Sequence, residues 1–218
     1  MRHARSILVL FGLLVILAGC GEPPRPTVNL YRAVHIGDLE QIKRHLFWGT
    51  EINQAGADGD YPLHVAVSKG RVAIARELLR HGARTDVRDR NGRTPLHVAL
   101  SNGKVPAAKL LRQHSADEDL QPLLFDLVRT GRADRDTLAF LISQGAELNT
   151  TDPQGHLPLH IAVAAGNVKL AKHLITAGAD VNQVDDAGDT PMALAERIDD
   201  PNTGPIMVEL LRQYGATE

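Results

Sequence analysis

Histidines and paired aspartates are the side chains in this sequence whose chemistry could bind a metal or transfer protons. The chain has ten histidines among 218 residues. Carboxylates at metal-ligand spacing do not accompany them, and the sequence has no glycine-rich phosphate loop, serine nucleophile motif or metalloprotease helix. The adjacent aspartates Asp185 and Asp186, like Asp199 and Asp200, stand in polar segments open to water, which suits turns better than general acid–base catalysis. We therefore expect no enzymatic activity, no metal site and no cofactor. The alternative, a hydrolase or metal-dependent enzyme, would show stoichiometric metal in the purified protein.

Cys20 is the one cysteine of the chain, which excludes an internal disulfide and a cysteine-rich metal site. The segment before it has the layout of an export signal, because residues 1–5 carry the basic charge and residues 7–18 read ILVLFGLLVILA. Twelve helical residues span about 18 Å, short of the ~30 Å hydrocarbon core of a bilayer. A stable transmembrane helix is therefore not expected here.

The export segment ends in Leu17-Ala18-Gly19-Cys20, which resembles the lipobox of bacterial lipoproteins. The resemblance implies a signal peptide of residues 1–19, a lipid on the Cys20 sulfur and an acyl group such as palmitate on the new amino terminus. An ordinary signal peptide is the alternative. Gly21 would follow the lipidated cysteine, and in this family that residue favours the outer membrane, facing the periplasm, over the inner membrane. Two or more acyl chains give stable anchoring.

The segment after the signal predicts a tether. Residues 20–27 comprise Cys20 and GEPPRPT, whose three prolines disfavour helix. At about 3.1 Å per residue they predict an extended spacer that holds the following domain roughly 20 Å from the bilayer.

Composition and charge narrow the function classes. The chain is 43% hydrophobic but only 4% aromatic, and its formal net charge is −2. Removal of residues 1–19 takes away Arg2 and Arg5 and no acid, so the mature chain becomes more negative. Nucleic acid is therefore not an expected partner, because its binding requires a basic face.

Residues 28–218 contain an internal repeat. Pro-Leu-His occurs at 62–64, 95–97 and 158–160, and Thr190-Pro191-Met192 continues the series. The first two copies are 33 residues apart, as are the last two. Thr94-Pro95-Leu96-His97-Val98-Ala99 resembles the opening of an ankyrin repeat, and Leu174-Ile175-Thr176-Ala177-Gly178-Ala179-Asp180-Val181-Asn182 resembles the end of its second helix.

This resemblance to the ankyrin repeat family implies an all-α repeat solenoid of helix-turn-helix units with short β-hairpin fingers. No single unit can bury its apolar face, so neighbouring units must stack. We expect about six units, at residues 28–60, 61–93, 94–119, 120–156, 157–189 and 190–218.

Several positions depart from the repeat. Tyr61 and Leu157 replace the threonine that caps the first helix, a loss of about 1 kcal/mol in each unit. The third unit is too short to hold most of a finger and has Asp117-Glu118-Asp119 instead, so we expect the groove to be broken or kinked near residue 117. Residues 199–204 are an insertion in the sixth unit.

Two further groups of residues have structural and functional interpretations. The ankyrin resemblance implies that His64, His97 and His160 hydrogen-bond between neighbouring units. Phe47 and Trp48 belong either to the core of the first unit or to an exposed contact surface.

Ankyrin arrays usually bind proteins through finger tips and the concave face of the first helices, and the same positions are candidates here. Arginines cluster in the finger of the second unit and aspartates in that of the fifth, which predicts a partner with an acidic patch at one end and a basic patch at the other. A solvated rim without a binding role is the alternative. The candidate partner-binding residues are Asp58, Asp60, Ser68, Lys69, Arg88, Arg90, Asn91, Arg93, Ser101, Asn102, Gln154, His156, Asp186 and Asp189.

These features together predict a protein–protein interaction module, an adaptor or scaffold held by a lipid anchor in the bacterial cell envelope. The alternative is an inhibitor or immunity protein that neutralises a toxin or enzyme acting in the periplasm. The identity of the partner protein is not encoded in any single motif.

Overall fold

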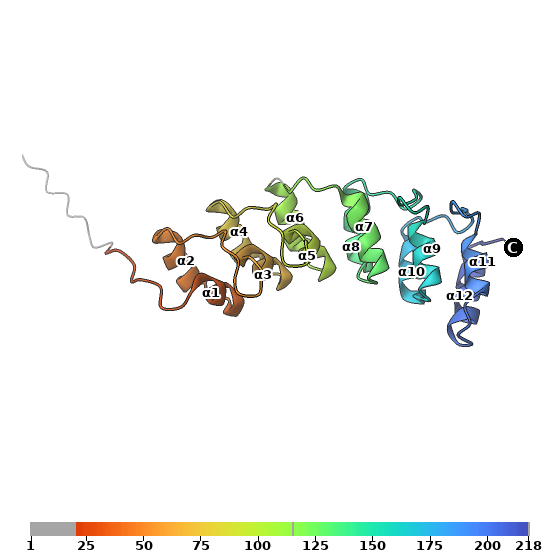
Figure 1. Ribbon diagram of the computed structural model, residues 1–218, viewed down its shortest axis with the longest axis horizontal. Helices are drawn as coiled ribbons and strands as arrows, with labels where there is room; N and C mark the ends of the chain where they lie inside the picture. The colour runs from red at the N-terminus through yellow and green to blue at the C-terminus, as the bar shows by residue number, and fades with distance from the viewer. Residues whose placement is uncertain (1–20, 115, 218) are drawn as a thin grey trace, which may run out of the picture.

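The computed structural model describes residues 21–114 and 116–217, so the predicted signal peptide and Cys20 lie outside the described residues. The described chain forms twelve helices and no strand. The helices pair into six helix-turn-helix units that stack along one axis, with the first and last units at opposite ends (Figure 1). The fold is the all-α repeat solenoid that the sequence predicts.

The first helix of each unit is six to ten residues long, and the second is nine to eleven. The first helices are α1 (Leu30–Ile36), α3 (Pro62–Ser68), α5 (Pro95–Ser101), α7 (Leu120–Arg129), α9 (Pro158–Ala164) and α11 (Pro191–Glu196). The second helices are α2 (Leu39–Phe47), α4 (Val72–Arg80), α6 (Val105–Gln113), α8 (Arg135–Ser143), α10 (Val168–Thr176) and α12 (Thr203–Gln213).

The starts of the first helices follow from their sequences. Helices α3, α5, α9 and α11 begin at a proline, whose missing N–H would have no partner in the first turn. The hydroxyls of Thr94 and Thr190 accept the backbone N–H three residues further on, at 3.2 and 3.1 Å, which confirms the predicted caps. Tyr61 and Leu157 make no side-chain cap bond, as expected.

The core runs the length of the stack. Each unit contributes leucines or methionines that are almost fully buried between its own helix pair and the next. This arrangement explains why the apolar positions recur with the repeat, since every unit covers its neighbour. Recurring core residues of the second helices are Leu78, Leu111, Leu141, Leu174 and Leu211.

The fingers are tight turns and not β-hairpins within the described residues. Asp89 Oδ1 accepts the backbone N–H groups of Asn91 and Arg93, at 2.8 and 2.9 Å. Asp152 and Asp185 each accept the backbone N–H groups two and four residues further on in the same way. Each of these aspartates also donates its own backbone N–H to the carbonyl four residues further on, so each finger closes as one tight turn and no described finger residue is in a strand.

The proline-rich tether does not stand away from the domain. Residues 21–29 contain no helix, but Trp48 Nε1 donates to the carbonyl of Pro23 at 3.1 Å and Thr27 N donates to Gln41 Oε1 at 2.9 Å. Side chains on and after α2 therefore hold Pro23 and Thr27 of the expected spacer against the first unit.

Candidate protein-binding surface

The finger tips lie along one edge of the solenoid and join in two pairs. Arg90 and Asp58, both about three-fifths exposed, approach to 3.8 Å between the first and second fingers. Between the fifth unit's finger and the one before it, the backbone N–H of Asp186 donates to the carbonyl of Gly155 at 3.1 Å. The edge thus consists of two two-finger blocks.

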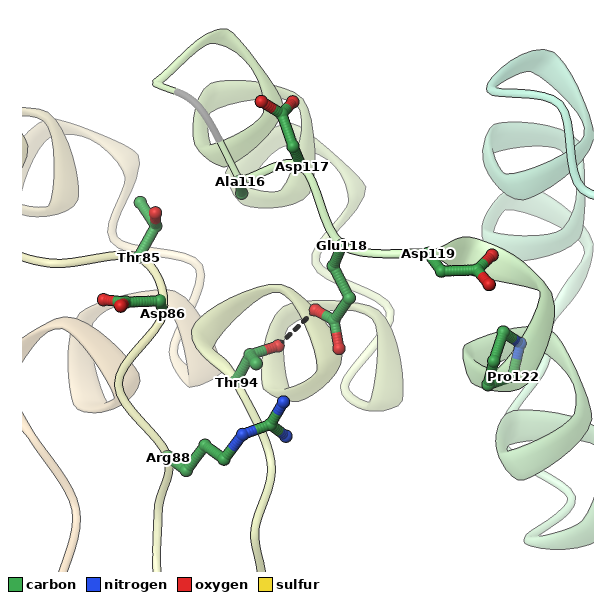
Figure 2. Close-up of a pocket in the computed structure, with 9 residues that line it drawn as sticks. All are labelled: Thr85, Asp86, Arg88, Thr94, Ala116, Asp117, Glu118, Asp119 and Pro122. Carbon is green, nitrogen blue, oxygen red and sulfur yellow. Dashed lines mark hydrogen bonds between the residues drawn. The ribbon is translucent and has the colours of Figure 1, made fainter.

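A notch separates these blocks where the third unit lacks its finger. The cavity has a volume of about 610 Å³ and lies between the second finger and the start of α7 (Figure 2). Arg88 points into it from the finger side, and Glu118 faces it from the linker, where Thr94 Oγ1 donates to Glu118 Oε2 at 2.5 Å. The residues that line the notch are Thr85, Asp86, Arg88, Thr94, Ala116, Asp117, Glu118, Asp119 and Pro122.

The linker beside the notch is held in place by the helices around it. Arg112 on α6 donates to the carbonyls of Ala116 and Glu118, at 2.7 and 3.3 Å. Asp119 caps α7 by accepting the N–H of Gln121 at 3.0 Å. The expected break in the groove near residue 117 is therefore a shaped notch. Its walls could not be placed from sequence because Arg112 and the linker carbonyls meet only in the fold.

The predicted arginine cluster is partly neutralised within its own finger. Arg93 pairs with the buried carboxylate of Asp89 at 2.7 Å, and Arg84 pairs with Asp86 at 2.9 Å. Arg88 donates to the carbonyl of Gly92 at 2.7 Å. Burial opposes ionisation of Asp89, but donors from the Arg93 side chain and from backbone N–H groups outweigh it, so the pKa of Asp89 lies below its ordinary value. Arg93 therefore stabilises the finger through its ion pair with the buried Asp89.

The acidic end is partly neutralised too, by a residue that sequence reasoning missed. Arg197, the C-cap of α11, donates two hydrogen bonds to Asp189, at 2.7 and 2.8 Å. These bonds hold the pKa of Asp189 below its ordinary value. Arg197 lies eight residues further along the chain, at the other end of α11, and its side chain reaches Asp189 from there. Asp186 is exposed at the finger tip.

In the fingers of the first and fourth units, the candidate residues lie next to polar or charged neighbours. Burial, with the carboxylates of Asp60 and Asp58 adding to it, raises the pKa of Tyr31, which places both acids near that ring. Gln154 Oε1 accepts Arg129 Nη2 at 3.3 Å, and His156 Nδ1 lies 3.5 Å from the buried Asp152 carboxylate. Asn91 is exposed at the second finger's tip.

The candidate residues at the ends of the first helices divide by exposure. Lys69 and Asn102 are exposed, and Ser68 is half-buried with its hydroxyl donating to its own helix at 3.0 Å. Ser101 is only 8% exposed, and Arg132 from the following unit reaches its carbonyl at 3.5 Å. Ser101 therefore offers a partner far less surface than Lys69 or Asn102.

Of the three motif histidines, two bond to the last residue of their own unit, and only His97 makes the bond to a neighbouring unit that the resemblance implied. His64 Nε2 donates to the carbonyl of Arg93, and His160 Nε2 to that of Asp189, both at 2.9 Å. His97 instead pairs with Asp126 at 2.8 Å. Over the residues that the structure describes, no three His, Cys, Asp or Glu side chains are grouped to hold a metal, and no helix has the length and apolar character needed to cross a bilayer.

Comparisons with known proteins agree with this geometry. A family model described as ankyrin repeats (three copies) matches residues 30–121 and again residues 124–216. Potassium channel AKT1 from Oryza sativa is 41% identical over 59 residues, which cover 27% of this chain and 6% of the channel. The crystal structure of the human ASB11 ankyrin repeat domain is 27% identical, with a TM-score of 0.66 over 87% of this chain and 85% of that one.

A solved complex of a predatory endopeptidase from Bdellovibrio bacteriovorus with an immunity protein also contains a similar chain. It is 21% identical, with a TM-score of 0.61, and the match covers 83% of this chain and 96% of that one. At this identity the similarity is one of fold.

Proposed function

Since the chain belongs to the ankyrin repeat family, whose domains are interaction modules, we propose that it is a non-enzymatic adaptor or scaffold that binds one protein along its finger edge. The observation that carries the proposal is the division of this edge into two finger blocks around a notch. A partner segment seated in the notch would contact the second finger on one side and the linker and the start of α7 on the other. Buried notch contacts would supply affinity, and the charged tips would set register and association rate.

The charges at the finger tips indicate which kind of protein surface would bind there. Arg88 lines the notch, Arg90 lies on the same finger beside Asp58 of the first finger, and Asp186 is exposed at the tip of the fifth unit's finger. We propose a partner that presents acidic groups toward the second finger and basic groups toward the fifth. Each internal pair described above reduces the net field, so the contribution of these charges should depend on salt concentration.

The place of action follows from the lipobox and is proposed on that basis alone. Lipidation of Cys20 and cleavage before it would anchor the domain to a bacterial envelope membrane, with Gly21 favouring the outer membrane and its periplasmic face. Mass spectrometry of the mature amino terminus tests the modification, and the Cys20→Ala variant should leave the membrane fraction.

The binding proposal is tested by affinity capture from an envelope extract of the source organism. Capture of one stoichiometric protein that is lost with the Arg88→Glu and Arg90→Glu double variant supports it. The matched control is Arg76→Glu, the same charge reversal at an exposed position of α4. Capture that is unchanged by the double variant would exclude the second finger as the binding surface.

An inhibitor or immunity role is the second candidate. The fold-level similarity to the endopeptidase–immunity protein complex favours including it, although 21% identity does not carry a function across. The captured partner separates the two roles. An inhibitor abolishes the partner's activity at stoichiometric concentration, whereas a scaffold leaves that activity unchanged.

A further inference from the structure

Residues 23–28 form a strap that is fastened to the first unit at four points. The carbonyl of Pro23 accepts from Trp48 Nε1 at 3.1 Å, and the guanidinium of Arg25 lies 4.4 Å from the Trp48 ring centroid. Thr27 N donates to Gln41 Oε1 at 2.9 Å. The fourth point is the carbonyl of Val28, 2.7 Å from His45 Nε2.

The fourth point is the firmest, because His45 is only 6% exposed. Its second ring nitrogen lies 2.9 Å from Thr50 Oγ1, so both nitrogens have partners and the ring orientation is fixed. A buried ring with two hydrogen bonds resists displacement, since either group would be left unsatisfied. The strap therefore leaves the first unit along α2 in one direction.

Little free chain remains between the strap and the proposed lipid. Only Gly21 and Glu22 separate Cys20 from Pro23. Three steps of 3.8 Å between α-carbons put Cys20 within about 11 Å of Pro23. Trp48, which bonds Pro23, must then lie within a few side-chain lengths of the lipid-bearing residue.

The surface at this end has the character of a membrane interface. Phe47 is 58% exposed and meets the Trp48 ring edge-on, with 5.4 Å between ring centroids. Arg25 covers the Trp48 ring from the strap side. Aromatic rings with a polar edge favour the headgroup region of a bilayer, and a cation beside them suits anionic lipid. The end lies opposite the C-terminus (Figure 1).

We infer that the first unit rests on the bilayer, with Phe47 and Trp48 in the headgroup region and the later units projecting into the aqueous space. The occupant of this aromatic surface is lipid, as indicated by where the described chain begins and how short the path to Cys20 is. The inference rests on the proposed lipidation, and it gives the anchored domain a fixed orientation that a free spacer would not.

The chain supplies its own probe, because Trp48 is its one tryptophan. The full chain, purified from the membranes of a bacterial expression host, is reconstituted in phosphatidylethanolamine–phosphatidylglycerol vesicles with or without brominated acyl chains. We expect Trp48 emission to shift to shorter wavelength and to be lost in the brominated vesicles. The matched control carries Trp48→Phe and Tyr214→Trp, which moves the probe past α12 to the opposite end, and its emission should not change.

The outcomes separate the two proposals. Acylated, vesicle-bound protein whose Trp48 emission is the same in both vesicles overturns the orientation while leaving the anchor intact. Equal quenching of the Tyr214→Trp control also overturns it, because the solenoid would then lie flat. A mature chain without acyl groups overturns the anchor and the orientation together. If Trp48 is not quenched because a bound protein or the uncleaved residues 7–18 cover it, that protein or segment occupies the aromatic surface. This result would contradict lipid contact.

Discussion

At the residue scale, two buried histidine nitrogens reveal where the repeat is incomplete. His64 Nδ1 and His160 Nδ1 are buried without a hydrogen-bond partner in the described part of the chain. Both belong to units in which the capping threonine is replaced, by Tyr61 and by Leu157. These two units thus combine a first helix without a side-chain cap and a buried imidazole nitrogen without a partner, and each feature lowers stability.

Restoring the hydroxyl at the second unit should stabilise the protein. Tyr61→Thr supplies the α3 cap and places a hydroxyl near His64, and we expect a gain of about 1 kcal/mol in unfolding free energy. The Tyr61 ring packs at 5.7 Å from His64, so Tyr61→Val serves as the control that removes the ring without adding a hydroxyl. Urea denaturation measures both variants. Equal stability of the two would show that the hydroxyl contributes nothing.

The finger carboxylates make stability depend on pH in a stated window. The pKa of Asp89 lies below its ordinary value, so its contribution is complete above about pH 4 and is lost as pH falls through the lowered pKa. Burial lowers the pKa of His64, so its neutral form contributes above about pH 6.5 and is lost on acidification below that value. As the pH falls from 7, stability is therefore lost first through His64 and then, below about pH 4, through Asp89.

Asp89→Asn should therefore change the pH dependence of the unfolding free energy only below about pH 4. We expect a loss of about 1–3 kcal/mol at pH 7, because the amide cannot replace the charged bonds to Arg93 and the turn. As the pH falls below 4 toward the lowered pKa of Asp89, the difference between the variant and the parent should shrink. Unfolding free energies measured by urea titration between pH 3 and 7 check this, and a constant difference across the range would contradict the assignment.

At the element scale, the helices were predictable and the fingers were not. Thr94 caps α5 and Pro95 begins it, so local residue types set the start of this helix. Every unit that keeps these residue types at the 33-residue spacing is expected to begin its first helix in the same way. The finger turns depend on Asp89 and its equivalents accepting two N–H groups each, a local choice that the family pattern of hairpin strands concealed. The Asp189–Arg197 pair was missed because it crosses from a finger to the far end of α11.

Contact between adjacent fingers can be tested at a single glycine. Gly155 has φ of +84°, and a β-carbon there would approach the Asp186 β-carbon to 2.5 Å. Gly155→Ala should therefore lower the unfolding free energy by more than the ~1–2 kcal/mol of left-handed strain, and it should separate the fingers of the fourth and fifth units. Gly188→Ala is the matched control, since φ is +82° and a β-carbon there meets nothing within 4 Å.

Two measurements check this comparison. Urea denaturation should give a larger loss for Gly155→Ala than for Gly188→Ala. Hydrogen exchange should accelerate at the Asp186 amide in the first variant alone, because that amide donates to the Gly155 carbonyl. Equal effects of the two substitutions on both readouts would show that the fingers are not coupled.

At the scale of the whole molecule, the short third unit divides the solenoid. The junction between α5 and α7 is looser than the other junctions between first helices, and the two family matches, at residues 30–121 and 124–216, meet just after it in the first turn of α7. The sequence predicted this break from the missing finger. It did not predict the contacts that span it, because His97 and Asp126 meet across an irregular linker whose path no repeat specifies.

Those contacts decide whether the two halves unfold together. The junction contains the His97–Asp126 pair at 2.8 Å and a long contact from Thr137 Oγ1 to the Leu100 carbonyl at 3.5 Å. Repeat proteins unfold as a sum of unit stabilities and interface terms, so cooperativity fails first at the weakest interface. Asp126→Ala should uncouple the halves and turn a single urea transition into two.

Hydrogen exchange followed by mass spectrometry at intermediate urea checks this prediction. In the Asp126→Ala variant, peptides from α1–α6 and from α7–α12 should report two distinct opening free energies. The matched control, Asp136→Ala, removes an exposed carboxylate of α8 and should keep one transition. A partner that fills the notch would contact both halves of the solenoid, the second finger and the start of α7, so its binding should restore a single transition in the Asp126→Ala variant. If two transitions persist at saturating partner concentration, the partner binds one block alone and the notch is not its seat.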